Sequence, residues 1–146
     1  MQSEVYALRE SDSVLDALRL FSDKRISGAP VLDEKGGLAG FISDGDIIGA
    51  LSRQDPTVSF YAVVTDPDKG DFSSKLEALR GITVGQLATK SVVSVDLSAR
   101  MTDVCTLLSQ RHLKKMPVLK DGRVVGVINR SDITGYAVTR YIELGA

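Results

Sequence analysis

The chain has 146 residues, a formal net charge of −1, 43% hydrophobic and 25% charged residues, one cysteine and one histidine. This composition is that of a globular protein of one or two small domains, and the charge argues against nucleic acid or an anionic membrane as a partner. It also excludes an internal disulfide and a Cys/His zinc site, and no apolar run approaches the roughly 20 residues of a membrane span, so a cytoplasmic protein without metal is expected.

The first part of the chain, residues 1–51, begins with a predicted strand and an amphipathic helix. The strand is expected at residues 5–8, and Ser11-Asp12-Ser13 offers caps for the helix that follows. Apolar side chains then recur at helical spacing and predict one buried stripe, formed by Val14, Ala17, Leu18 and Phe21.

Two strands and a second helix complete this part. Residues 29–33 read as a buried strand and residues 38–42 as its return strand, joined by a turn at Lys35-Gly36-Gly37. Ser43 then opens a helix that runs to Leu51. The predicted order is therefore strand, helix, strand, strand, helix.

Residues 52–81 form an insertion with weaker signals. They predict a strand at 60–64, a polar turn at 66–71 and a short helix at 72–79. The turn only faintly resembles a calcium loop, because Asp71 stands where such a loop needs glycine, so no metal site is expected there.

The last part, residues 82–146, repeats the same order after a leader at 82–90. Ser98 is the expected helix cap, Asp121-Gly122 the hairpin turn and Asn129 the cap of the last helix. The apolar stripe of its first helix, expected to be buried, is Met101, Val104, Cys105 and Leu108. The first part has no equivalent leader, which is compatible with a chain cut from a longer protein.

The two parts are copies of one unit. Residues 27–32 read Ser-Gly-Ala-Pro-Val-Leu and residues 114–119 read Lys-Lys-Met-Pro-Val-Leu. Residues 36–47 and 122–133 align in the same order, with glycine, isoleucine and aspartate at matching positions. One such unit is too small to bury both faces of its sheet, so the two are expected to pack together with pseudo-twofold symmetry.

A second shared pattern carries a family resemblance. Residues 40–46 read Gly-Phe-Ile-Ser-Asp-Gly-Asp and residues 126–132 read Gly-Val-Ile-Asn-Arg-Ser-Asp. With these motifs the sequence resembles the tandem CBS domain pair, or Bateman module. The resemblance implies an α+β fold of two β-α-β-β-α repeats packed sheet to sheet, homodimerisation, and binding of an adenosyl ligand in the cleft between the repeats.

The resemblance also implies how a ligand would be held. A carboxylate accepts both hydrogen bonds of a ribose diol, which is the role expected for Asp46 and Asp132. Ser43 and Asn129 lie at the same helix starts, where unpaired N–H groups favour phosphates. Asn129 departs from the Ser or Thr of the family motif.

Further candidate positions follow from the same resemblance. Lys114 and Lys115 stand where the family places phosphate-binding basic residues, and Arg130 is a third candidate cation. The first repeat has Ser27 and Gly28 at the lysine positions. The positions implied to line the adenine slot are Tyr6, Ala7, Ala29, Pro30, Ser94, Met116 and Pro117.

Structural explanations compete with these roles. Ser-x-x-Asp and Asn-x-x-Asp at a helix start are also capping boxes, and exposed lysines are most often a solvated surface. The sequence shows no nucleophile paired with a base, so no enzyme is expected. The leading hypothesis is a regulatory sensor of AMP, ADP, ATP, S-adenosylmethionine or NAD that acts on an attached or partner effector; the alternative is a structural dimerisation module that binds no nucleotide.

Overall fold

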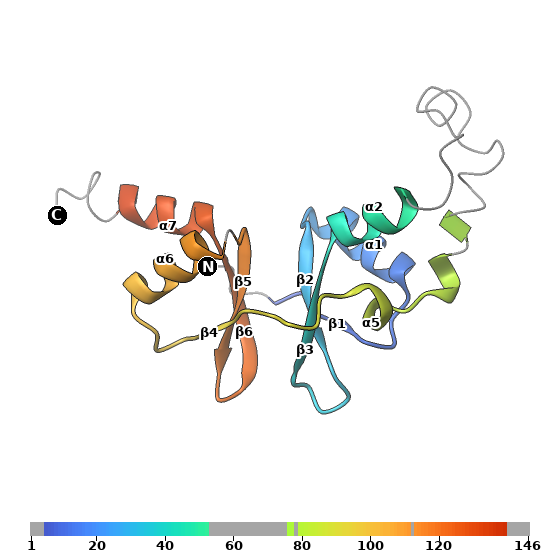
Figure 1. The fold of residues 1–146 in the computed structure, drawn as a ribbon, viewed down its shortest axis with the longest axis horizontal. Helices are drawn as coiled ribbons and strands as arrows, with labels where there is room; N and C mark the ends of the chain where they lie inside the picture. Colours follow the sequence, from blue (N-terminus) through green and yellow to red (C-terminus); the bar gives the residue numbers. More distant parts are fainter. Residues whose placement is uncertain (1–4, 53–75, 78, 112, 140–146) are drawn as a thin grey trace, which may run out of the picture. The chain divides into compact units, whose positions relative to one another are not determined.

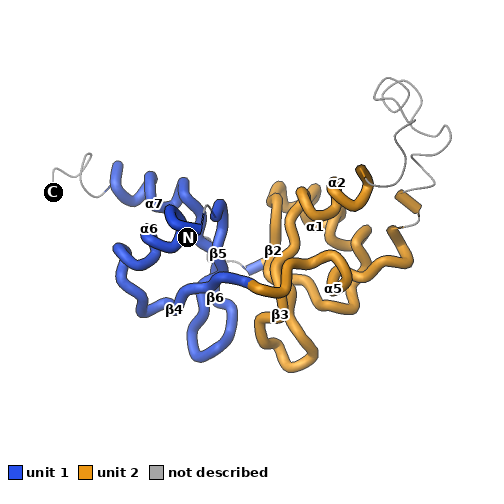
Figure 2. Tube along the Cα trace, viewed as in Figure 1, with its two compact units in different colours: residues 1–5, 92–146 blue, residues 6–91 orange. Residues whose placement is uncertain are grey.

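A computed structural model describes residues 5–52, 76–77, 79–111 and 113–139. The chain divides into two compact units (Figure 2): residues 6–91, called here the first-repeat unit, and residues 1–5 with 92–146, the second-repeat unit. The strand and turn expected at 60–64 and 66–71, and most of the helix expected at 72–79, lie outside the described residues.

The first-repeat unit contains a three-stranded sheet with helices on one face (Figure 1). Its strand order is β1-β2-β3, with β1 parallel to β2 and β2 antiparallel to β3. The described elements are β1 (Leu8–Arg9), α1 (Val14–Lys24), β2 (Gly28–Leu32), β3 (Leu38–Ser43), α2 (Asp44–Ser52), the 3₁₀ helix η1 (Leu79–Gly81) and α5 (Val84–Leu87).

The second-repeat unit has the same topology, with strand order β4-β5-β6 and α6 and α7 on one face of the sheet (Figure 1). Its described elements are β4 (Val95–Asp96), α6 (Met101–Gln110), β5 (Lys115–Lys120), β6 (Arg123–Asn129) and α7 (Arg130–Ala137). The predicted α+β class and the repeated strand-helix-strand-strand-helix order are therefore confirmed.

The local signals of α1 act as predicted. The Ser13 hydroxyl accepts a hydrogen bond from the Asp16 N–H (3.1 Å), and the Asp16 carboxylate accepts one from the Ser13 N–H (3.2 Å). The helix ends at Arg25, which adopts a left-handed conformation with φ of 54°. The stripe buries its side chains in a core that includes Val14, Ala17, Phe21, Ile42 and Ile47.

Three local predictions were wrong. Helix α6 starts after Arg100, not at Ser98, whose hydroxyl and N–H instead donate to the Asp96 carboxylate at 2.6 and 2.9 Å. Met101 and Cys105 are exposed rather than buried, because the buried face of α6 is narrow and centres on Val104 and Leu108. The first strand covers Leu8–Arg9 rather than 5–8, since only these residues pair with β2.

Residues 82–91, called here the strap, lie on the first-repeat unit although they precede the second repeat in sequence. The Val84 N–H donates to the Asp12 carbonyl (2.7 Å), and Phe41 and Thr89 exchange two backbone hydrogen bonds of 2.9 Å. The strap thus extends the sheet at the β3 edge. The expected grouping of residues 82–90 with the second repeat follows chain order, whereas the hydrogen bonds place them with the first.

Candidate functional site

The ribose motif of the first repeat lies where β3 ends and α2 begins. The Asp46 Oδ2 atom accepts hydrogen bonds from the Ser43 N–H (2.9 Å) and hydroxyl (3.2 Å), and the Asp46 N–H donates to the Ser43 hydroxyl (3.3 Å). This reciprocal arrangement caps α2, as the structural explanation of the motif predicts. Both side chains are half-buried.

The second motif builds the same cap with a different side chain. The Asn129 Oδ1 atom accepts from the Asp132 N–H (2.9 Å) and from the Ser131 hydroxyl (2.6 Å), while Asp132 Oδ2 accepts from the Asn129 N–H (2.9 Å). The amide oxygen of Asn129 therefore replaces the hydroxyl of Ser43 in capping the helix. The oxygen itself cannot donate as a hydroxyl can, so the donors of the Asn129 side chain are on its amide nitrogen.

Strand pairing places the residue two positions before each Pro-Val pair opposite the residue that caps the following helix. Gly28 pairs with Ser43 in the first repeat, and Lys115 pairs with Asn129 in the second. Directly paired residues of antiparallel strands have Cα atoms about 5 Å apart. The second motif is therefore flanked by lysine, with Lys114 exposed and Lys115 half-buried, whereas the first is flanked by glycine.

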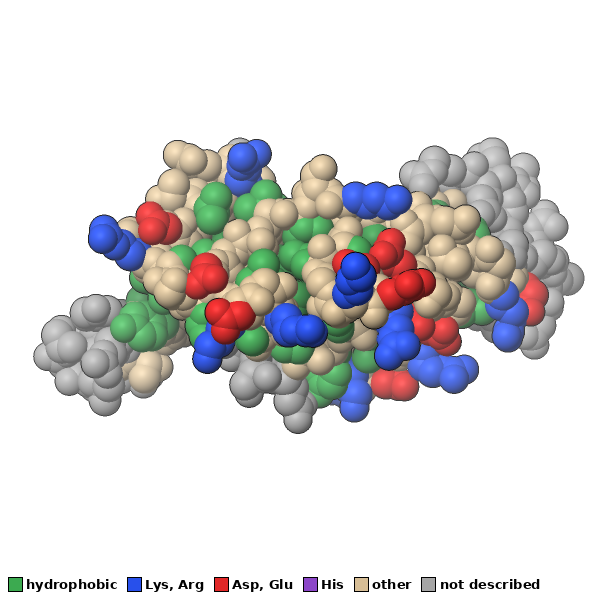
Figure 3. Space-filling model, turned by 90° about the horizontal axis from the view of Figure 1, so that it is seen from below, with side chains coloured by type: hydrophobic (Ala, Val, Ile, Leu, Met, Phe, Trp, Pro, Cys, Tyr) green, Lys and Arg blue, Asp and Glu red, His purple; other side chains and the backbone are tan. Residues whose placement is uncertain are grey.

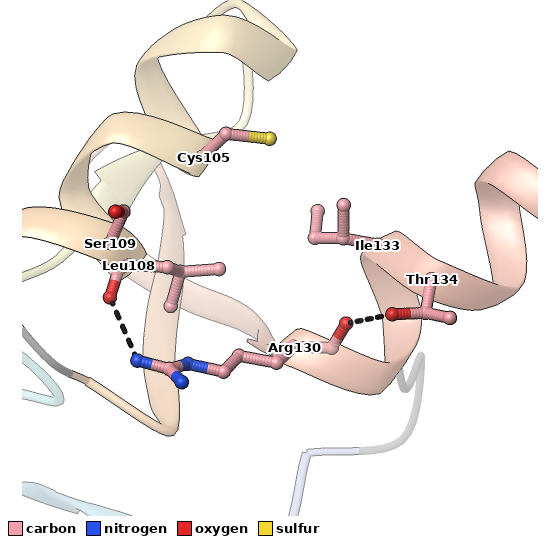
Figure 4. Close-up of a pocket in the computed structure, with 6 residues that line it drawn as sticks. All are labelled: Cys105, Leu108, Ser109, Arg130, Ile133 and Thr134. Atoms are coloured by element: carbon pink, nitrogen blue, oxygen red, sulfur yellow. Dashed lines mark hydrogen bonds between the residues drawn. The ribbon is translucent and has the colours of Figure 1, made fainter.

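Arg130 has a partner that the sequence did not reveal. Its Nε atom donates to the Leu113 carbonyl (2.9 Å) and Nη2 to the Leu108 carbonyl (3.3 Å); the second bond is drawn in Figure 4. These carbonyls lie near the end of α6 and just beyond it. Only the fold brings them to the start of α7, so no spacing along the chain would have indicated the contact.

The positions implied for an adenine slot fall into two groups. Tyr6, Ala7 and Ser94 are half-buried, and the Lys24 ammonium lies 5.3 Å from the centroid of the Tyr6 ring. The other four are buried: Ala29, Pro30, Met116 and Pro117. Ala29 and Met116 belong to the hydrophobic cores of their units, so their side chains serve packing.

Two cavities lie within single units, and the described residues that line them do not include Ser43, Asp46, Asn129 or Asp132. One of about 430 Å³ opens between α6 and α7 (Figure 4) and is lined by Cys105, Leu108, Ser109, Arg130, Ile133 and Thr134. Another of about 750 Å³ lies in the first-repeat unit and is lined by Arg9, Glu10, Ser11, Leu32, Asp33, Glu34, Gly36 and Thr83. Neither was predicted, because each is formed by side chains of separate elements.

On the face drawn in Figure 3, acidic and basic side chains are interspersed rather than gathered by sign. Among the described residues, no three His, Cys, Asp or Glu side chains form a group able to hold a metal ion. None of the described helices is both long and apolar enough to span a membrane.

Comparison with known proteins adds a family match. The sequence model of the CBS domain matches residues 1–53 and 84–139. The chain is 27% identical over 143 residues to the chloroplastic CBS domain-containing protein CBSX2 of Arabidopsis thaliana, covering 94% of this chain and 60% of that protein. It is 26% identical over 131 residues to inosine-5'-monophosphate dehydrogenase of Staphylococcus aureus, covering 90% of this chain but 22% of the enzyme. The chain thus spans less than two thirds of these relatives.

Solved structures share the fold. CBSX2 in complex with AMP superposes with a TM-score of 0.72 at 27% identity, covering 95% of this chain and 92% of that one. The CBS domain pair of protein MJ0100, in complex with 5'-methylthioadenosine and S-adenosyl-L-methionine, gives a TM-score of 0.71 at 20% identity, covering 96% and 93%. The second likeness is one of fold alone.

Proposed function

The chain belongs to the CBS domain family, and we propose that it is a non-catalytic regulatory module that binds an adenosyl ligand at its ribose motifs. The candidate ligands are AMP, ADP, ATP, S-adenosylmethionine and NAD. Binding is passed to an attached or partner effector, which requires that the ligand favour one conformation over another. The complex of CBSX2 with AMP supports this class of ligand.

The main support for the proposal is the hydrogen bonding of the Asp46 carboxylate. Its Oδ2 atom takes both hydrogen bonds from Ser43, and Oδ1 accepts none from the described residues. The carboxylate is half-buried at the start of α2 and keeps an oxygen available for a ligand. A ribose hydroxyl is a donor of the kind that this oxygen accepts.

In the second repeat the proposed ligand residues are Asp132 for the ribose and Lys114 with Lys115 for phosphate. Lys114 precedes β5, and Lys115, the first residue of that strand, lies opposite Asn129 in the β-ladder. An ammonium group is a phosphate ligand that acts as a point charge. The adenine positions remain those that the family resemblance implies, with Tyr6, Ala7 and Ser94 the more accessible ones.

Thermal melting with AMP, ADP, ATP, S-adenosylmethionine, NAD and GTP, followed by calorimetric titration, tests the proposal. A ligand at about 100 times its Kd adds about 2.7 kcal/mol of stability, a shift of a few degrees. Asp46→Asn keeps an oxygen for the α2 cap but removes the charge, and should weaken binding about tenfold or more. Asp44→Asn, the same change two residues away on an exposed side chain, is the matched control and should bind as wild type.

A structural dimerisation module is the alternative, because the caps alone give Ser43, Asp46, Asn129 and Asp132 a role without ligand. Apolar side chains exposed on helices favour dimerisation in either case: Ile48 is 61% and Met101 43% exposed. Sedimentation equilibrium of wild type, Ile48→Glu and Met101→Glu reports the assembly. A stable dimer that responds to none of the six ligands would establish the alternative.

A further inference from the structure

Arg130 connects the start of α7 to the segment that leaves α6. Its guanidinium donates through Nε to the Leu113 carbonyl (2.9 Å) and through Nη2 to the Leu108 carbonyl (3.3 Å). The carbonyls at a helix C-terminus lack partners within the helix, and a planar fork of donors is suited to bridging two of them. Leu108 itself is fixed in the core, with 4% of its surface exposed.

The segment held in this way carries the two lysines. Leu113 is followed directly by Lys114 and Lys115, and Lys115 pairs with Asn129, the residue before Arg130. The backbone of residues 113–115 is therefore held by the β5–β6 ladder, by the Arg130 side chain and by the Leu113 N–H, which donates to the Leu108 carbonyl (3.3 Å). The ladder and the Arg130 side chain fix the lysines relative to the ribose motif at 129–132.

The first repeat has neither part of this arrangement. Asp44 stands at the position of Arg130, and its carboxylate has no N–H to donate. Contact there runs through the backbone, where the Asp44 N–H donates to the Ser27 carbonyl (2.8 Å). Ser27 and Gly28 occupy the lysine positions, so the two cations and the residue that anchors their segment occur together in one repeat.

We propose that Arg130 is a positioning residue for phosphate selectivity: it does not touch the ligand, but holds residues 113–115 so that Lys114 and Lys115 meet the phosphate of a phosphorylated adenosyl ligand. The inference rests on the proposed function, because it requires such a ligand at the second repeat. It adds that Arg130 sets the position of the two lysines that the proposed function assigns to phosphate. It also replaces the direct role in ligand binding that the sequence suggested for Arg130.

Calorimetric titration with adenosine and with AMP at fixed ionic strength measures the phosphate increment, the ratio of Kd for adenosine to Kd for AMP. In Arg130→Met this ratio should fall by about fivefold to tenfold, while the Kd for adenosine stays within about threefold. Arg123→Met removes the same charge from an exposed residue at the hairpin end of β6 and should leave the ratio unchanged. Arg130→Lys keeps the charge without the fork, and its ratio should also fall.

A double-mutant cycle separates positioning from direct contact. In the Lys114→Ala/Lys115→Ala background, Arg130→Met should cause no further fall in the ratio, because its effect passes through the lysines. An independent further fall would show that Arg130 binds phosphate itself and would overturn the inference. An equal loss of adenosine and AMP binding would overturn it as well, since that is the result of a merely structural role.

Two outcomes in the wild-type protein distinguish this inference from the proposed function. Binding of adenosine and AMP with equal Kd would leave adenosyl binding at the ribose motifs intact, but would overturn the phosphate role of the lysines and with it the positioning role of Arg130. Absence of binding by either compound and by the other adenosyl ligands would overturn both. An Arg130→Lys variant that keeps the full wild-type ratio would show that charge, not the bridge between the two carbonyls, is what matters.

Discussion

Replacing Gly40 by alanine tests whether the glycine of the first ribose motif is needed so that the strap can pack closely against β3, rather than for binding a ligand. A Cβ atom at position 40 would lie 2.8 Å from the Thr89 carbonyl oxygen and 3.3 Å from the Ala88 Cβ. Because a backbone atom cannot give way cheaply, the strap must move off β3. Both 2.9 Å hydrogen bonds between Phe41 and Thr89 then weaken or break.

The magnitude follows from these two bonds. Each contributes about 0.5–1.5 kcal/mol, so their loss costs about 1–3 kcal/mol. Alanine recovers about 0.4–1 kcal/mol by restricting the unfolded chain. At the midpoints of the two ranges, the net loss expected for Gly40→Ala is about 1.3 kcal/mol, which lowers the melting temperature by about 3–5 °C for a chain of this size.

Urea denaturation and amide hydrogen exchange together provide the assay. Exchange should accelerate at the Phe41 and Thr89 N–H groups and change little in the β5–β6 ladder. Gly135→Ala is the control: a Cβ there meets no atom within 4 Å, and alanine in a helix should stabilise by up to about 1 kcal/mol. If Gly40→Ala is as stable as wild type and keeps the protection of Thr89, the argument from close approach is refuted.

Three further changes have expected outcomes. Arg25→Gly should raise the urea-derived stability by about 1 kcal/mol, because Arg25 has a φ of 54° that glycine adopts without strain. Met116→Ala should cost about 2–5 kcal/mol in the same assay, because its side chain is fully buried, whereas the exposed Lys120→Ala on the same strand should stay within about 0.5 kcal/mol. The hydrogen bonds from Ser98 lower the pKa of Asp96, so the pKa of Asp96 measured by NMR titration should be higher in Ser98→Ala than in wild type. Any stability gained from these bonds should be lost as pH falls through the Asp96 pKa. An unchanged pKa in Ser98→Ala would contradict this assignment.

The sequence predicted those parts of the fold that local patterns determine. Ser13 and Asp16 cap α1, and Asp121 and Gly122, with φ of 53° and 79°, form the predicted hairpin turn. Each of these depends on a few neighbouring residues. The place of the strap does not, because the pairing of Thr89 with Phe41 joins segments far apart in the chain.

The same distinction applies to the candidate site. The sequence identified Ser43 and Asp46, and the structure brings them into hydrogen-bond contact at a helix start. It did not reveal that Arg130 donates to the Leu108 carbonyl of α6 and to the Leu113 carbonyl beyond that helix, since these contacts depend on how two helices pack on one sheet. Exposure of Cys105 was missed because apolar spacing alone does not fix the width of a buried face.

The two helix caps show which sequence differences between the repeats are not required for folding. Ser43 and Asn129 accept a hydrogen bond from the corresponding helix N–H group, at 3.3 and 2.9 Å, so capping alone does not demand one side chain over the other. The fold likewise tolerates either Asp44 or Arg130 at the next position, since both repeats form the same sheet and helices. Differences that the fold does not require are those that a ligand or partner would select. Because they change charge and hydrogen-bond donors at corresponding positions, the proposed function predicts that the two ribose motifs differ in ligand selectivity.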